Sequence, residues 1–195
     1  MKIERRVFTA DQCELRNDDG VSTVKGHGAV FNRESEDLGG FIEVIAPGAF
    51  DDVLDDDVRA LWNHDANHIL GRTVSGTLRL SVDESGLAYE IDMPDTQLAR
   101  DLAVSMERGD VTQSSFAFTV ADDDWEEYPG GYKRTINKIG RLYDVSPVTY
   151  PAYPDADAGL RSLEKIKEKA KQMRTESALA SNALLKAKLK LKELA

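Results

Sequence analysis

The amino-acid sequence predicts an α+β protein, mainly an antiparallel β-barrel flanked by helices, with a helical C-terminal tail. Three observations predict this class. Short stretches alternate apolar and polar residues between turn residues, one longer stretch has a helical period, and the composition changes near Gly159. Many short strands favour a barrel over a doubly wound sheet. We therefore expect a barrel domain at residues 1–158 and a basic, Lys/Leu-rich tail at residues 159–195.

The strands are predicted from alternation of side chains and from the turns that bound them. They are expected at residues 2–8, 24–31, 41–45, 58–62, 76–82, 87–93, 113–120, 132–136 and 140–150. Two glycines inside the second stretch indicate a bulge or a close approach of backbones. Residues 47–54 are expected to form a short helical turn, and the acidic triplets at 55–57 and 122–124 are expected to be solvated turns.

One substantial helix is predicted before the seventh strand. Apolar residues recur every four positions at Leu98, Leu102 and Met106. Asp95 or Thr96 would cap the start of this helix, and Gly109 stands where a glycine commonly follows a helix end. The helix is therefore expected to end near Arg108.

Charge is distributed unevenly along the chain. The net charge is -10, and residues 161–195 hold ten Lys/Arg and four Asp/Glu, so the tail carries +6 and the rest -16. An acidic body repels phosphates, which argues against general nucleic-acid binding. No apolar run of about 18 residues is present, so no membrane span is expected. With Cys13 as the single cysteine, we expect no internal disulfide, no thiolate metal cluster and a reducing, cytoplasmic setting.

The stretch at residues 113–120 contains the candidate nucleophile. Alternation puts Phe116 and Phe118 on one face and Ser115 on the other. If the aromatic face packs on a core, Ser115 sits on a rigid backbone, which is what a nucleophile requires when a base and an orienting group are supplied. An ordinary half-buried strand with a serine on its wetter face explains the same pattern.

A base and an orienting group can be sought among few residues. Of the three histidines, His27 stands between two glycines and is expected to be structural, whereas His64 ends a strand in a polar loop from which its ring could reach a cleft. Asp144 interrupts an apolar strand, where a carboxylate is costly unless it is paired. It could orient a histidine, or it could form a salt bridge with Arg134 or Arg141.

A metal site is an alternative reading of His64 and His68, because two histidines four apart share a face of a helix. The surrounding residues are turn-like, however, and no Glu follows His64 as it would in a zincin helix. We therefore expect neither a metal nor another cofactor.

Five ordered stretches together resemble the prohead maturation proteases of tailed bacteriophages. They are residues 26–32, residues 45–50, residues 61–65 with 70–73, residues 114–118, and residues 144–153. The resemblance covers about residues 1–160. Ala117 stands where many relatives have Gly, and a small residue is kept. The family is distantly related to the herpesvirus assembly proteases, which are β-barrels wrapped by helices.

The resemblance implies a serine endopeptidase in which Ser115 is the nucleophile, His64 the general base and Asp144 the residue that orients His64. The third member is a histidine in the herpesvirus enzymes. Their oxyanion donors lie near an arginine after that residue. The corresponding loop here, near residues 152–155, has no arginine before Arg161, and no oxyanion donor is assigned.

The resemblance also implies partners and a location. Such a protease acts inside the assembling phage procapsid in the bacterial host cytoplasm, on scaffold or on the scaffolding segment of the major capsid protein, and often on itself. The portal is a further candidate partner, and a homodimer is suggested by the herpesvirus relatives. The tail would then be a targeting, scaffold-like or self-removed segment. Alternatives of another class are a non-enzymatic internal assembly factor with the same barrel and a metal hydrolase that uses His64 and His68.

Overall fold

The computed structural model describes residues 3–8, 13–18, 21–150, 160–168 and 171–172. The chain divides into two compact units, residues 1–158 and 159–195. In the second unit, residues 160–168 and 171–172 are helical, and the rest of the expected tail lies outside the described residues. None of the helices in the described ranges is both long and apolar enough to cross a membrane.

The first unit is a mixed α+β structure that consists mostly of strands in two sheets. The larger sheet has the order β1-β9-β10-β5-β6, with β4 also paired to β10, and the smaller has the order β2-β3-β8-β7. The elements of the first unit are β1 (Glu4–Phe8), β2 (Glu14–Asp18), β3 (Val21–Val30), β4 (Phe41–Ile45), β5 (Arg59–Trp62), β6 (Asp65–Arg72), β7 (Leu78–Val82), β8 (Gly86–Asp92), α1 (Gln97–Glu107), β9 (Gln113–Tyr128) and β10 (Gly131–Val148).

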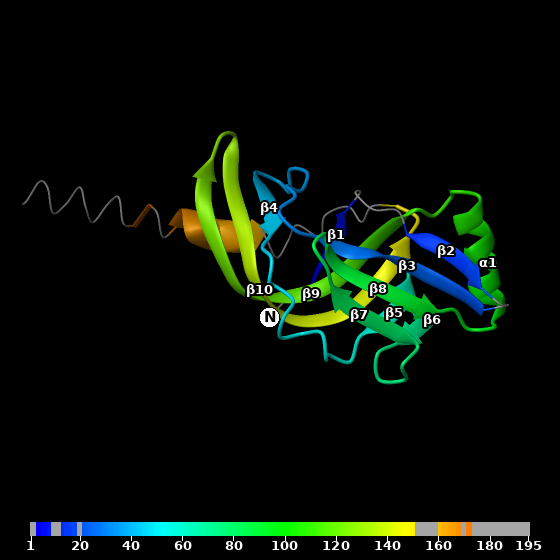
Figure 1. Ribbon diagram of the computed structural model, residues 1–195. Helices are drawn as coiled ribbons and strands as arrows, with labels where there is room; N and C mark the ends of the chain where they lie inside the picture. Colours follow the sequence, from blue (N-terminus) through cyan, green and yellow to red (C-terminus); the bar gives the residue numbers. More distant parts are fainter. Residues whose placement is uncertain (1–2, 9–12, 19–20, 151–159, 169–170, 173–195) are drawn as a thin grey trace, which may run out of the picture. The chain divides into compact units, whose positions relative to one another are not determined.

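The two long strands β9 and β10 form the backbone of the larger sheet. They pair antiparallel over most of their length and curve strongly (Figure 1). Both β4 and β5 pair with β10 in parallel, so the larger sheet is not purely antiparallel. The ladder between β9 and β10 contains several bulges, one of them between Leu142 and Asp144. Bulges of this kind bend a strand and increase its twist, which accounts for the curvature.

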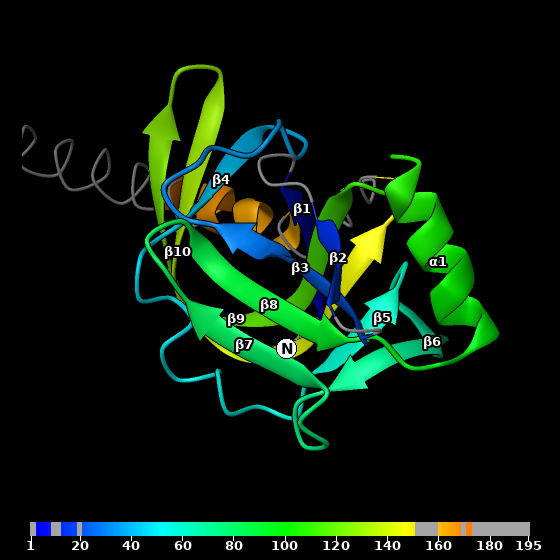
Figure 2. The ribbon, with the colours of Figure 1, turned by 45° about the vertical axis from the view of Figure 1, so that its right-hand side comes forward.

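The hydrophobic core is formed by side chains from both sheets and from α1. Figure 2 shows how these elements are arranged. Side chains from the smaller sheet, such as Leu87 and Ile91, join Phe116 and Phe118 of β9 in one cluster. The rings of Phe116 and Phe118 stack with centroids 4.4 Å apart. Leu102 and Met106 of α1 close one end of the core. The face of β9 that was predicted to be apolar therefore packs inward.

Glycines let the smaller sheet approach β9 and β10 closely, as the paired glycines of the sequence indicate. A Cβ on Gly28 would lie 3.2 Å from Val145 and 3.7 Å from Phe116. A register shift between His27 and Ala29 shows a bulge at the same place. The bulge, one of the two alternatives predicted from these glycines, therefore occurs here.

Several predicted elements differ from the structure. The acidic triplet at 122–124 was expected to be a turn, but it lies inside β9. Its carboxylates have partners across the ladder: Asp123 accepts a hydrogen bond from Arg134 at 2.6 Å, and Asp124 accepts one from Asn137 at 2.8 Å. These pairs offset the low strand propensity of aspartate.

Two predicted strands are one continuous β10, and two strands were missed. β6 was expected to be a loop, and no strand was expected at the residues of β2. Residues 47–54 form successive hydrogen-bonded turns, which agrees with the short helical turn that was predicted there. The helix α1 begins after Thr96, whose side chain accepts a hydrogen bond from the Ala99 amide, and Gly109 follows its end with φ 80°.

Buried ion pairs fasten the first strand to the larger sheet. Arg6 donates to Glu43 of β4 at 2.8 Å and to Glu4 at 2.6 Å. Arg134 of β10 bonds the same two carboxylates at 2.8 and 2.9 Å. The four side chains are at most 5% exposed. We call Glu4, Arg6, Glu43 and Arg134 the buried ion cluster; it holds β1 in register beside β9.

Candidate active site

The nucleophile candidate Ser115 stands on β9, between β1 and β10. Val7 of β1 and Ser146 of β10 are its direct cross-strand partners. Side chains alternate along β9, so Ser115 lies on the face opposite Phe116. The neighbouring Ser114 shares the inward face, where its hydroxyl bonds the Tyr89 hydroxyl at 2.6 Å. The two adjacent serines therefore have different environments, and only Ser115 lies on the side of His64.

A two-residue turn places His64 beside Ser115. The turn joins the antiparallel strands β5 and β6, with Trp62 opposite Asp65. Asn63 and His64 both have φ 57°. Positive φ at both central residues is typical of the type I′ turn, which matches the twist of a hairpin. This hairpin was not predicted from the sequence, because its turn contains no glycine.

Asn63 ties this turn to the end of β10. The Asn63 amide donates to the carbonyl of Pro147 at 3.0 Å, and its side-chain oxygen accepts from the Thr149 amide at 2.8 Å. A residue other than glycine in the left-handed region is strained and persists where the surroundings hold it. These bonds from β10 hold the turn and so fix the position of His64.

The side chains of Ser115, His64 and Asp144 form one hydrogen-bonded chain. His64 Nε2 lies 2.6 Å from Ser115 Oγ, and His64 Nδ1 lies 2.6 Å from Asp144 Oδ1. Ser115 is 0% exposed. The side chains of His64 and Asp144 are 8% and 9% exposed. Asp144 reaches this position because it is paired with Ala117, two residues beyond Ser115 on β9.

Proton positions follow from the partners. An ionised carboxylate only accepts hydrogen bonds, so Nδ1 carries a proton toward Asp144 and the neutral ring leaves Nε2 as an acceptor. Such a ring can take the proton of Ser115. The alternative that pairs Asp144 with Arg134 or Arg141 does not occur, because Arg134 belongs to the buried ion cluster and Arg141 stacks over Tyr143 at 5.0 Å.

A second acceptor faces Ser115. The Ser115 hydroxyl oxygen lies 2.9 Å from the main-chain carbonyl oxygen of Arg6, in β1. One hydroxyl proton serves one acceptor at a time. With a neutral His64 the proton can go to Nε2, whereas a protonated His64 donates to Ser115 Oγ and the hydroxyl then donates to Arg6. This carbonyl, which was not predicted from the sequence, therefore holds the serine oxygen when His64 is protonated, and competes with Nε2 for the hydroxyl proton when His64 is neutral.

The other two histidines lie apart from this chain. His27 bonds Asp83 at 2.8 Å on the smaller sheet. His68 is on β6, 3.6 Å from Asp65, with its ring 5.9 Å from that of Trp62. Among the described residues there is no group of three or more His, Cys, Asp or Glu with the geometry of a metal site. Both nitrogens of His64 are engaged by Ser115 and Asp144.

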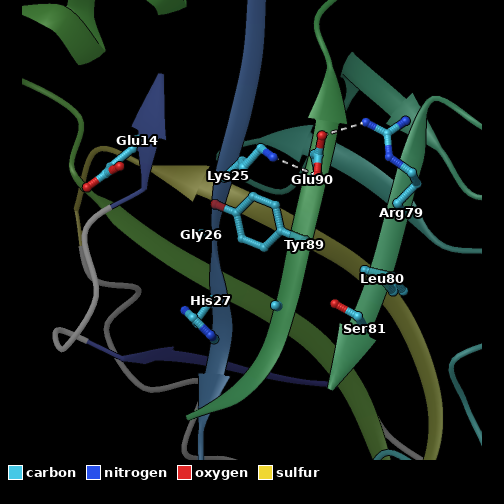
Figure 3. Close-up of a pocket in the computed structure, with 10 residues that line it drawn as sticks. Glu14, Lys25, Gly26, His27, Arg79, Leu80, Ser81, Tyr89 and Glu90 are labelled. Atoms are coloured by element: carbon cyan, nitrogen blue, oxygen red, sulfur yellow. Dashed lines mark hydrogen bonds and ion pairs between the residues drawn. The ribbon is translucent and has the colours of Figure 1, made fainter. Parts of the chain in front are cut away.

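An open groove on the smaller sheet is separate from these residues (Figure 3). It encloses about 460 Å³ over β3, β7 and β8. Its charged side chains bond one another: Lys25 and Arg79 each lie 2.9 Å from Glu90. The groove contains none of the three residues of the hydrogen-bonded chain.

Comparison with known proteins connects this geometry with a family. A model of the caudovirus prohead serine protease matches residues 10–171. The chain is 30% identical over 168 residues to the prohead protease of Enterobacteria phage HK97, a match that covers 83% of this chain and 69% of that protein. The structure of the capsid assembly protease of bacteriophage T4 aligns over 77% of this chain and 97% of its own, with a TM-score of 0.47 and 12% identity. The chain therefore belongs to the caudovirus prohead serine protease family.

Proposed function

We propose that the chain is a serine endopeptidase of prohead maturation in which Ser115 is the nucleophile, His64 the general base and Asp144 the residue that orients His64. The observation that carries this proposal is the continuous chain from Ser115 Oγ through both nitrogens of His64 to Asp144 Oδ1, at 2.6 Å for each contact. A hydroxyl, an imidazole and a carboxylate in this order can activate a serine.

The chemistry follows from the proton positions. His64 Nε2 takes the Ser115 proton as Oγ attacks the carbonyl carbon of the scissile peptide. The imidazolium then gives that proton to the leaving amine, and an ester between Ser115 and the substrate acyl group remains. Water, activated by His64 in the same way, hydrolyses the ester. Asp144 holds Nδ1–H and stabilises the charge on the ring in both steps.

The substrates that fit this family are capsid proteins. We propose that the chain cleaves scaffold, the scaffolding segment of the major capsid protein and itself, inside the procapsid in the bacterial host, with the portal and a second copy of the chain as further partners. We also propose that its two sheets form a barrel like that of the herpesvirus enzymes. No oxyanion donor is assigned, and the loop at residues 152–155 lies outside the described residues.

The decisive experiment is co-expression with the cognate major capsid protein, followed by mass spectrometry of the products. Wild type is expected to yield shortened capsid protein, and Ser115→Ala is expected to leave it at full length. Ser114→Ala is the matched control, because it removes the hydroxyl of the adjacent, equally buried serine on the opposite face. Identical product masses for wild type and Ser115→Ala would contradict the proposal and favour the non-enzymatic assembly factor.

The role of the tail has its own test. The charge reversal after residue 160 supports a targeting or scaffold-like segment, or one that the enzyme removes from itself. Deletion of residues 161–195 is expected to lower the amount of protease inside procapsids, measured by immunoblotting of purified particles. Unchanged packaging would contradict the targeting role.

A further inference from the structure

Ser146 lies next to two members of the hydrogen-bonded chain, Asp144 and His64. It is 0% exposed, and its hydroxyl oxygen is 2.7 Å from Asp144 Oδ1 and 3.4 Å from His64 Nδ1. It stands two residues after Asp144 on β10, so both side chains lie on one face of the strand. In the ladder it is directly opposite Ser115.

The protonation state of Asp144 determines the direction of the hydrogen bond between Ser146 and Asp144. When Asp144 is ionised it accepts only, so Ser146 must donate its hydroxyl proton to Oδ1. That same oxygen accepts from His64 Nδ1 at 2.6 Å. A carboxylate that receives two donors on one oxygen, inside a buried site, cannot rotate without breaking a charge-assisted hydrogen bond. Ser146 therefore fixes the orientation of the carboxylate.

Ser146 also affects the proton on His64. Because its own proton is directed to Asp144, its oxygen presents only lone pairs toward Nδ1. Two acceptors, Asp144 Oδ1 and Ser146 Oγ, then surround Nδ1 at 2.6 and 3.4 Å. A bare Nδ1 would face two electron-rich oxygens with no proton between them. The neutral ring is thus held as the tautomer with Nδ1 protonated and Nε2 free to accept from Ser115.

We propose that Ser146 is a positioning residue of the protease, which locks the Asp144 carboxylate and the reactive tautomer of His64. This inference rests on the proposed function, because it concerns the same three residues. In this role Ser146 acts through Asp144 and His64. Its removal lowers the reactivity of Ser115 without abolishing it.

If the role of Ser146 were purely structural, its loss would have the same effect as the loss of another buried serine. Ser114 provides that comparison. Ser114 is also 0% exposed and its hydroxyl also makes one short bond, to Tyr89 at 2.6 Å. It lies on the inward face of β9. Loss of this hydroxyl removes a buried hydrogen bond of similar length at a distance of one residue from Ser115, but leaves the contacts of His64 and Asp144 intact.

The test uses the full-length chain and a fluorophosphonate–rhodamine probe, which requires no knowledge of the substrate. In the labelling step Ser115 Oγ bonds to phosphorus, fluoride leaves and His64 takes the hydroxyl proton, so the second-order rate constant measures activation of the serine. We expect Ser146→Ala to label about 10-fold more slowly than wild type, the size expected when a hydrogen bond to a charged group is lost. Ser146→Thr, which keeps a hydroxyl, should recover most of that rate, and Ser114→Ala should label like wild type.

Proton NMR supplies a readout that does not depend on reactivity. The proton on His64 Nδ1, which is hydrogen-bonded to the Asp144 carboxylate, should resonate at unusually low field in wild type and in Ser115→Ala. In Ser146→Ala it should move upfield or broaden, while in Ser114→Ala it should not change. If Ser146→Ala does not fold, Ser146→Cys keeps the side-chain volume with a much weaker donor and carries the same expectations.

The outcomes separate the two proposals. Labelling of Ser115→Ala at the wild-type rate would overturn the proposed function. Absence of labelling in Ser115→Ala, together with wild-type labelling and an unchanged low-field proton in folded Ser146→Ala or Ser146→Cys, would overturn the role of Ser146 alone. Equal slowing in Ser114→Ala and Ser146→Ala would also overturn it, because the effect would then be a general loss of buried hydrogen bonds.

Discussion

At the scale of single residues, the proposed mechanism has Asp144 act through the proton on His64 Nδ1, which lies 2.6 Å from its carboxylate. Asp144→Asn keeps the shape of the side chain, but an amide can donate to Nδ1 and so favours the tautomer with the proton on Nε2. Ser115 then faces a donor where it needs an acceptor. We expect labelling by the fluorophosphonate probe to fall by about 10³-fold or more.

The control for Asp144→Asn tests whether the variant still folds. Asp144→Asn should show the wild-type circular dichroism spectrum and a similar midpoint of urea unfolding, since the carboxylate and the amide have nearly equal volumes. A variant that labels at the wild-type rate would show that Asp144 does not determine the tautomer of His64.

The single cysteine gives a prediction about pH. Burial raises the pKa of the Cys13 thiol to about 11, although hydrogen bonds from Ser114 and Tyr89 oppose this shift. The folded protein therefore keeps a protonated thiol at pH 8, whereas an unfolded cysteine ionises near pH 8.5. We expect Cys13 to react with Ellman's reagent slowly in native buffer and fast in urea.

The raised pKa of Cys13 also makes the free energy of unfolding depend on pH. Between about pH 8.5 and 11 the unfolded chain loses the Cys13 proton while the folded chain keeps it, so the free energy of unfolding falls as pH rises through this window. Cys13→Ser should show a smaller fall between pH 8 and 10.5 in urea titrations. An equal fall in both proteins would contradict the assignment to Cys13.

At the scale of elements, the buried ion cluster determines the register of β1. A one-residue slip would turn Glu4 and Arg6 away from Glu43 and Arg134 and would move the Arg6 carbonyl off Ser115. Arg6→Met alone leaves the carboxylates of Glu4 and Glu43 with one arginine between them. We expect this variant to lose about 3–5 kcal/mol in the free energy of unfolding.

A double variant separates charge from packing. Arg6→Met combined with Glu43→Gln removes both partners of one pair, so its loss should be clearly smaller than the sum of the two single losses in urea unfolding. Strict additivity would contradict a direct interaction between these side chains.

Some features of the elements could be predicted from the sequence and others could not. Alternation alone placed Phe116 and Phe118 inside and Ser115 on the other face, because a strand has a fixed period of two. The roles of His64 and Asp144 came from a resemblance of ordered motifs, since no local pattern says that β5 and β9 both flank β10. The acidic residues 122–124 were misassigned because their partners are 11 to 13 residues away across the ladder.

Ser146 could have been noticed in the sequence. It follows Asp144 by two residues in a predicted strand, so the two side chains share a face, and a serine on the face of a buried carboxylate is a natural donor. The Arg6 carbonyl could not, because any residue supplies a carbonyl and only the pairing of β1 with β9 directs this one at Ser115.

At the scale of the whole molecule, the acidic body and the basic tail predict a dependence on salt. If residues 161–195 attract an anionic partner in the procapsid, their net charge of +6 makes that attraction weaken as ionic strength rises. Binding of the full chain to isolated scaffold, measured by sedimentation, should fall between 50 mM and 500 mM NaCl. Binding of the chain without residues 161–195 should be weaker at low salt and change less.

The short turn that carries His64 also limits how the length of this chain can vary. Asn63 and His64 are the entire connection between β5 and β6, and both backbones lie in the left-handed region. An inserted residue would change the turn type and rotate the imidazole away from Ser115, even if both strands stayed paired. In an insertion scan, the turn before β7 at residues 73–76 should accept added residues with labelling preserved, whereas residues 63–64 should accept none.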